Sequence, residues 1–166
     1  MRFLPVTAGA LLVELPDLPR TLALLRALQA GPPEGVTEVI PAARTLLVYY
    51  EPWRLDDAQL AAAVAAIAQK AESAAQSAAE SGAPPEEAAG ALVQIPVRYD
   101  GEDLAEVAAH LGLRGAQVIA RHTAQPWQVA FAGFAPGFAY LSGGDAVFDV
   151  PRRASPRTRI PAGSVG

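Results

Sequence analysis

The alternation of apolar and polar positions in the first fifty residues predicts three strands and one helix. The apolar run Leu11–Val13 predicts a short buried strand. Asp17 can cap a helix over Leu18–Ala30, in which leucines recur at helical spacing. Val36–Ile40 and Leu46–Tyr50 are rich in residues that favour extended backbone, and we expect two further strands there.

A second helix is expected to begin at Asp56. Gln59 follows three residues later, which is the spacing of a capping box. Apolar residues then recur on one face, at Leu60, Val64 and Ile67. The helix is expected to fray in the alanine-rich stretch after Lys70, and residues 81–90 read as a linker because they hold adjacent prolines and no apolar periodicity.

Beyond this linker the pattern predicts two more strands and two helices. Leu92–Val97 is expected to be a strand, and apolar positions from Leu104 to Leu111 predict a helix that ends at Gly112. A second short helix is expected over Arg114–Arg121, and a central strand over Trp127–Phe134. The predicted fold class is therefore α+β.

The order strand, helix, strand, strand, helix, strand is typical of a ferredoxin-like split unit. The expected domains are residues 1–80, a linker at 81–90, and residues 91–166. The strand predicted at Leu92–Val97 could complete the first domain or open the second, and the sequence leaves both alternatives open.

Composition narrows the classes of function. Hydrophobic residues make up 51% of the 166 residues, which is enough for a packed core, and cysteine is absent, so disulfides, thiolate metal ligands and a cysteine nucleophile are excluded. No charge-free apolar run of membrane-spanning length occurs, and the first residues do not resemble a secretory signal; we expect a cytoplasmic protein. The formal net charge of −4 argues against non-specific nucleic-acid binding.

Charge is unevenly distributed along the chain. Residues 1–120 hold eight basic and fifteen acidic side chains, whereas residues 121–166 hold five arginines and two aspartates. Arg153, Arg157 and Arg159 stand among turn-forming prolines, and the planar guanidinium group suits phosphate or carboxylate. A solvated loop with scattered arginines is the alternative interpretation.

The second candidate segment is Gly133–Leu141, with the sequence GFAPGFAYL. Pro136–Gly137 favours a type II turn, and its glycines allow close approach of a ligand to the backbone. The alternative is a tight turn whose aromatic residues fill the core.

The two histidines differ in their expected roles. His110 falls near a helix C-terminus, where a structural role is expected, and His122 is a candidate general base. Two histidines without cysteine do not make a zinc site, and no metal is expected. No Walker A, Rossmann or G-x-S-x-G pattern is present.

These segments carry a family resemblance. GFAPGFAYL, followed by VPRRASPRTRIPAGSVG, resembles the paired signature of the 5-oxoprolinase B subunit family, also called allophanate hydrolase subunit 1 or KipI-like. IPVRYDGEDLAEVAAHLGL and the triplet Arg121-His122-Thr123 fit the same family in order and spacing. The resemblance covers about residues 3–166, whereas the alanine-rich stretch 61–89 matches little of it.

The resemblance implies a small N-terminal α/β domain followed by a cyclophilin-like β-barrel of the carboxyltransferase type. It implies a subunit of an ATP-dependent 5-oxoprolinase, inactive alone, which cleaves 5-oxoproline to glutamate together with subunits C and A. ATP is expected to bind the complex, on a subunit that the sequence does not identify. The alternatives are a KipI-like inhibitor of a histidine kinase and a subunit related to allophanate hydrolase or urea carboxylase.

The expected catalytic residues are His122 and Arg157. The expected substrate- or anion-binding residues are Gly133, Pro136, Gly137, Phe138, Tyr140, Arg153, Ser155, Arg159, Gly163 and Ser164. Members of the family continue beyond the IPAGSVG motif, so the resemblance also implies a second domain that is incomplete at its C-terminus, with an open sheet edge that invites association.

Overall fold

The computed structural model describes residues 1–80 and 91–165, which divide into two compact units. One unit holds residues 1–80 and Phe131–Phe138, and the other holds residues 91–130 and 139–165. The predicted linker, residues 81–90, lies outside the described residues.

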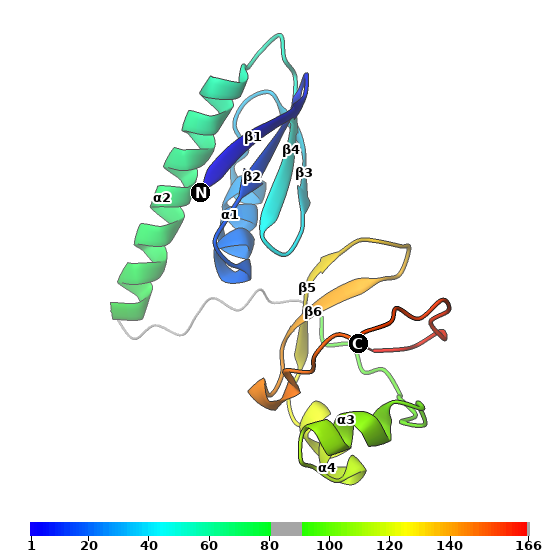
Figure 1. Ribbon diagram of the computed structural model, residues 1–166. Helices are drawn as coiled ribbons and strands as arrows, with labels where there is room; N and C mark the ends of the chain where they lie inside the picture. The colour runs from blue at the N-terminus through cyan, green and yellow to red at the C-terminus, as the bar shows by residue number, and fades with distance from the viewer. Residues whose placement is uncertain (81–90, 166) are drawn as a thin grey trace. The chain divides into compact units, whose positions relative to one another are not determined.

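The first unit is a four-stranded antiparallel sheet with two helices (Figure 1). Its elements are β1 (Arg2–Thr7), β2 (Ala10–Glu14), α1 (Leu18–Ala30), β3 (Val36–Pro41), β4 (Thr45–Tyr50) and α2 (Asp57–Glu80). The strand order is β1-β2-β4-β3. The predicted positions of both helices and of three strands are confirmed, but α2 continues to Glu80 through the stretch after Lys70 in which fraying was expected.

Both predicted helix caps are present. The Asp17 carboxylate accepts a hydrogen bond from the backbone N–H of Arg20 at 2.9 Å, at the start of α1. Before α2, the N–H of Gln59 donates to the Asp56 carboxylate at 2.8 Å and the N–H of Asp56 donates to the Gln59 side chain at 3.0 Å. These reciprocal bonds satisfy N–H groups that the first turn of a helix leaves without partners.

Two strands differ from the prediction: one that was expected after residue 90 is missing, and β1 at the start of the chain was not expected. The strand predicted at Leu92–Val97 is wrong, because this segment has no regular structure and the Leu92 and Ile95 side chains are 76% and 74% exposed. An extended segment is a strand only where a partner supplies hydrogen bonds, and Pro96 has no N–H to donate. In the first sheet the place beside β2 is taken by β1, which pairs antiparallel with it through a turn at Gly9.

Gly9 is required at that turn. Its φ is +89°, and a Cβ there would lie 2.8 Å from the carbonyl oxygen of Tyr50. The same backbone approach lets the Tyr50 N–H donate to the Gly9 carbonyl at 2.9 Å. The hairpin β1–β2 is thereby joined to the end of β4.

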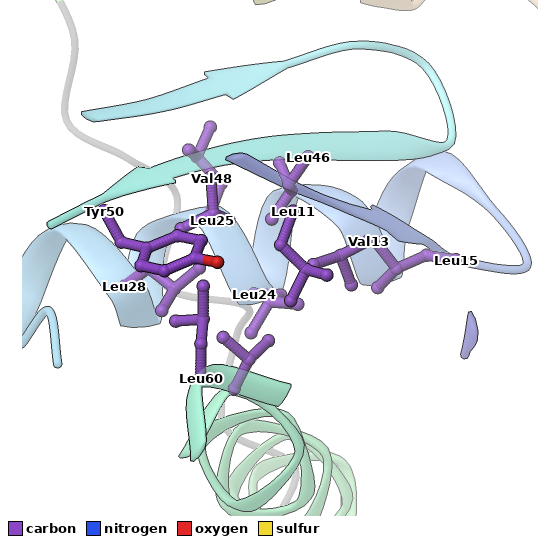
Figure 2. Packing of buried hydrophobic residues seen from close by; sticks show 11 residues of the cluster. Leu11, Val13, Leu15, Leu24, Leu25, Leu28, Leu46, Val48, Tyr50 and Leu60 are labelled. Atoms are coloured by element: carbon purple, nitrogen blue, oxygen red, sulfur yellow. The ribbon is translucent and has the colours of Figure 1, made fainter. Parts of the chain in front are cut away.

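The core of the first unit lies between one face of the sheet and the two helices (Figure 2). Because side chains alternate along a strand, Leu11 and Val13 of β2 share a face, as do Leu46, Val48 and Tyr50 of β4. The side chains that complete the cluster are Leu15, Leu24, Leu25, Leu28, Leu60 and Val64. All eleven are at most 8% exposed.

The second unit has few regular elements. It contains α3 (Leu104–His110), α4 (Gly115–His122) and the short 3₁₀ turn η1 (Ala146–Phe148). Most of β5 (Trp127–Ala132) and all of β6 (Ala139–Gly143) also belong to it, and these two strands pair with each other and, within the described residues, with no other strand. The predicted helices and the strand at Trp127 are confirmed, whereas β6 was not predicted.

Candidate functional site

The loop between β5 and β6 contains two consecutive tight turns. The Phe138 N–H donates to the Ala135 carbonyl at 3.0 Å, and Gly137, at the third position of that turn, has a φ of +76°. This is the predicted type II turn over Pro136–Gly137. The Gly133 N–H donates to the Phe138 carbonyl at 3.2 Å and closes the loop.

The first turn places Phe134 in a strained conformation. Phe134 has a φ of 67°, and the Ala135 N–H donates to the Gly133 carbonyl at 2.8 Å across it, which is the pattern of the rare γ-turn. The side chain is 88% exposed and meets the Phe138 ring edge-on at a centroid distance of 5.4 Å. Strain of this kind persists where the surroundings maintain it and gathers at functional sites.

A cluster of rings surrounds His122, the last residue of α4. The Tyr99 hydroxyl lies 2.6 Å from the Nδ1 atom of His122. The Trp127 ring lies 5.0 Å from the imidazole at a tilt of 37°, and the Phe148 ring meets it edge-on at 5.7 Å. The indole N–H of Trp127 donates to the His122 carbonyl at 2.8 Å, so both the ring and the backbone of His122 are held.

Arg153 and Arg157 meet acidic side chains at the start of α3. Arg157 lies 2.6 Å from a Glu102 oxygen and 2.7 Å from an Asp103 oxygen. Arg153 lies 3.0 Å from the same Asp103 oxygen and 3.4 Å from Glu106. We call these five residues the arginine–carboxylate cluster.

The guanidinium groups of this cluster thus have carboxylate partners from their own chain. The Arg157 side chain is 27% exposed, whereas that of Arg153 is 52% exposed, so Arg157 is the more enclosed of the two. An anionic ligand would have to join or displace these carboxylates. The prediction that the arginines bind an anion remains a prediction.

The remaining predicted site residues lie on exposed loops. Gly163 has a φ of +80°, and the Ser164 hydroxyl donates to the Pro161 carbonyl at 2.8 Å in a local turn. The others are exposed, namely Gly133, Pro136, Gly137, Tyr140, Ser155 and Arg159. The structure brings Arg153 and Arg157 together around Asp103, and it places His122 in a separate aromatic environment.

Sequence reasoning missed the partners of these residues. Tyr99, Trp127 and Phe148 are spread over fifty positions, and no spacing rule links them to His122. The acidic partners carried a weak signal, because Asp100, Glu102, Asp103 and Glu106 fall within seven residues, whereas residues 121–166 carry an excess of arginine. Opposite charges in segments without a buried core are a reason to test for pairing.

Neither a candidate group of metal-ligating side chains nor a membrane-spanning helix is found among the described residues. No group of three or more His, Asp or Glu side chains there could hold a metal ion. Within the same part of the chain, no helix is both long enough and apolar enough to cross a membrane.

Comparison with protein families and curated sequences extends these observations. A family model described as carboxyltransferase domain, subdomain C and D, matches residues 1–166. The 5-oxoprolinase B subunit of Escherichia coli O157:H7 is 49% identical over 78 residues, which cover 45% of this chain and 36% of the relative. That of Bacillus subtilis (strain 168) is 49% identical over 78 residues, which cover 45% of this chain and 32% of the relative.

A third curated relative shows the same partial overlap. The 5-oxoprolinase B subunit of Haemophilus influenzae (strain ATCC 51907 / DSM 11121 / KW20 / Rd) is 42% identical over 80 residues, which cover 46% of this chain and 38% of the relative. The chain thus spans about a third of the length of the curated relatives that it matches.

Solved structures show a related backbone. The protein TTHA0988, crystallised in space group P6522, is 32% identical with a TM-score of 0.64, and the match covers 93% of this chain and 28% of that one. Its crystal form in space group P212121 has a TM-score of 0.61 at 34% identity, with 92% of this chain and 29% of that one covered.

Proposed function

This chain belongs to the carboxyltransferase domain family, subdomain C and D, and from that premise we propose that it is part of the B subunit of a 5-oxoprolinase. The observation that carries the proposal is the 49% identity over 78 residues to two relatives that are named as B subunits of 5-oxoprolinase. The proposed reaction is the ATP-dependent cleavage of 5-oxoproline to glutamate. Subunits C and A are the proposed partners.

The finer fold assignment belongs to the same proposal. We take the first unit as a ferredoxin-like domain whose fourth strand comes from the N-terminus, since β1 flanks β2 in the sheet. The second unit is proposed to be part of a cyclophilin-like barrel of the carboxyltransferase type. The match of the carboxyltransferase family model to residues 1–166 supports this assignment.

The chemistry of the reaction suits the residues present. The amide of a lactam is a poor electrophile, and phosphorylation of its oxygen makes the ring easier to open; the developing negative charge then needs hydrogen-bond donors. Arg157, Arg153 and His122 are donors of this kind in the second unit. ATP is proposed to bind the assembled complex, and the chain alone is proposed to be inactive.

The experiment is reconstitution with subunits A and C, with glutamate formation from 5-oxoproline and ATP as the readout. A complete B subunit that contains this chain, together with subunits A and C, should turn over, and this chain alone should not. In the complete complex, Arg157→Ala should lower kcat/KM by roughly a hundredfold, the loss of about 2–4 kcal/mol of charged hydrogen bonding. Activity within a factor of about three of wild type for both Arg153→Ala and Arg157→Ala would contradict the anion-site assignment.

The carboxylate partners provide the matched control. If Arg157 binds an anionic group of the substrate, Glu102→Gln should leave KM unchanged or lower it, because a competing carboxylate is removed. If Arg157 only holds the loop to α3, Glu102→Gln and Arg157→Ala should cause similar losses of stability and no specific change in KM.

A second candidate function is favoured by the exposed Phe134. A regulator that docks on a histidine kinase needs an accessible apolar surface, and the Phe134 side chain is 88% exposed on a strained turn. Phe134→Ser should abolish kinase inhibition if this function is correct. Turnover of 5-oxoproline by the reconstituted complex, together with no effect of this chain on the activity of a histidine kinase encoded nearby, would favour the enzyme over the regulator.

A further inference from the structure

The imidazole of His122 packs against three aromatic residues, of which Tyr99 has a polar atom within hydrogen-bond distance of the ring. The Tyr99 hydroxyl lies 2.6 Å from Nδ1, which is a short distance for an O–H donor. The Trp127 and Phe148 rings pack at 5.0 Å and 5.7 Å between centroids. Tyr99, His122, Trp127 and Phe148 are all half-buried. We call these four residues the histidine box.

The direction of the Tyr99–His122 hydrogen bond follows from the chemistry of its two groups. A phenol O–H is a stronger acid than a neutral imidazole N–H, and an imidazole nitrogen is a stronger base than a phenol oxygen. The arrangement with Tyr99 donating to an unprotonated Nδ1 is therefore favoured. In a neutral imidazole only one nitrogen carries the proton, which places it on Nε2.

Further contacts of the box hold the backbone of His122 and the rings around the imidazole. The Trp127 indole N–H donates to the carbonyl of His122 itself at 2.8 Å, which ties the backbone at the end of α4 to β5. Gly144 packs against the indole so closely that a Cβ there would lie 2.2 Å from a ring carbon. Tyr99 is held in turn by an edge-on contact with the imidazole at 5.7 Å.

We propose that Tyr99 is a positioning residue that holds His122 in the Nε2–H tautomer, so that His122 donates a hydrogen bond to a substrate oxygen and does not serve as a general base. This inference rests on the proposed function for the identity of the substrate, a small amide or its phosphorylated form. Phosphoryl transfer to the amide oxygen spreads negative charge over the phosphoryl oxygens, and an Nε2–H donor stabilises that charge. It reverses the role that sequence reasoning assigned to His122.

The direct test is ¹⁵N NMR of the histidine rings in this chain, recorded near pH 8.5, where a free imidazole is neutral. His110 is an internal reference, because it is exposed at the end of α3. We expect His122 in a single Nε2–H form and His110 as an averaged mixture of tautomers. Tyr99→Phe, which keeps the ring and removes the hydroxyl, should turn His122 into a mixture like that of His110.

Two NMR results would overturn the inference. One is an Nδ1–H form of His122 in the wild-type chain, and the other is a His122 spectrum that Tyr99→Phe leaves unchanged. An unaltered circular dichroism spectrum of the variant shows that the fold is retained. A second variant, Trp127→Phe, keeps the Tyr99 hydroxyl and should retain the Nε2–H form, so it separates loss of the hydroxyl from loosening of the box.

Turnover in the reconstituted complex separates this inference from the proposed function. Tyr99→Phe should lower kcat by roughly tenfold with little change in KM, because positioning acts on the charged transition state more than on binding. A complex with no turnover at all contradicts the proposed function, while the NMR result still decides the role of Tyr99. Full turnover by a complex that carries Tyr99→Phe would show that the reaction does not depend on the Nε2–H tautomer of His122.

Discussion

The two units of this protein are stabilised in different ways. In the first, eleven apolar side chains from the sheet and both helices form one buried cluster. In the second, the only buried apolar residues among those described are Ala108 and Val118. There the chain is held by the arginine–carboxylate cluster, by the histidine box and by local turns.

This difference makes the first unit a scaffold and leaves the second unit with side chains available for chemistry. Burial of apolar area is non-directional and tolerates changes at the surface, whereas ion pairs and aromatic contacts depend on a few atoms each. The candidate functional residues His122, Arg153 and Arg157 all lie in the second unit. Four predictions test the contrast, from the largest expected effect to the smallest.

Truncation of a leucine to alanine should lower the free energy of unfolding strongly in the first unit and hardly at all in the second. Leu24 is 1% exposed and Leu92 is 76% exposed. Leu24→Ala should cost about 2–5 kcal/mol of unfolding free energy, since it removes buried methyl groups and leaves a cavity. Leu92→Ala should change it by less than about 0.5 kcal/mol in urea titrations followed by circular dichroism. A large effect at Leu92 would show that the second unit has an unrecognised core.

A methyl group added beside the histidine box should disturb only the second unit. Gly144 has a φ of +81°, and a Cβ there would overlap the Trp127 ring. Gly144→Ala should destabilise this unit by about 1–3 kcal/mol through strain and displacement of the indole. The fluorescence of Trp127 should shift, as measured in a Trp53→Phe background. Gly101→Ala is the control, because nothing lies within 4 Å of its Cβ position, and it should leave the spectrum unchanged.

Salt should weaken the second unit more than the first. Arg157→Gln removes contacts to Glu102 and Asp103 and should cost about 1 kcal/mol, since these contacts are partly enclosed and paired to two carboxylates. The loss should shrink in high salt, as measured by limited proteolysis of the 151–165 segment. Arg159→Gln, at an exposed position outside the cluster, should have no such effect. Equal and salt-independent losses of stability for both variants would show that the arginine–carboxylate cluster does not hold this segment by electrostatic attraction.

The smallest effect concerns pH and the first unit. The hydrogen bond to the Asp57 carboxylate, together with burial and the nearby negative charge, raises the pKa of the Tyr50 hydroxyl above its ordinary value. A raised pKa in the folded state contributes stability that is fully present below about pH 10, the unfolded value, and is lost as the pH rises through the folded pKa.

Tyr50→Phe should therefore be less stable than the wild type at neutral pH, and the difference should narrow above about pH 10. Urea titrations at a series of pH values measure it. Tyr49→Phe, one residue away and 37% exposed, is the control. A gap that stays constant up to the highest pH at which the protein folds would mean that the Tyr50 hydroxyl does not titrate differently in the folded state.

The local sequence pattern was sufficient to predict the helices and the buried face of the sheet. The caps at Asp17 and Asp56 and the leucine spacing of α1 each act over a few residues, so they can be read directly. The type II turn at Pro136–Gly137 was predictable for the same reason. Strand pairing was not predictable, because Leu92–Val97 looks like a strand in isolation and has no partner in the described structure, while β1 pairs and includes a proline.

In the candidate site, too, local properties could be predicted from the sequence, whereas long-range contacts could not. The sequence by itself determined that arginines and glycines gather after position 130 and that a short helix precedes His122, since these are properties of composition and local backbone. Only the tertiary structure decided that Arg157 meets Glu102 and that Tyr99 meets His122, across 55 and 23 positions of chain. Contacts at such separation depend on how the chain folds back on itself, and no local preference encodes the atom to which a side chain will bond.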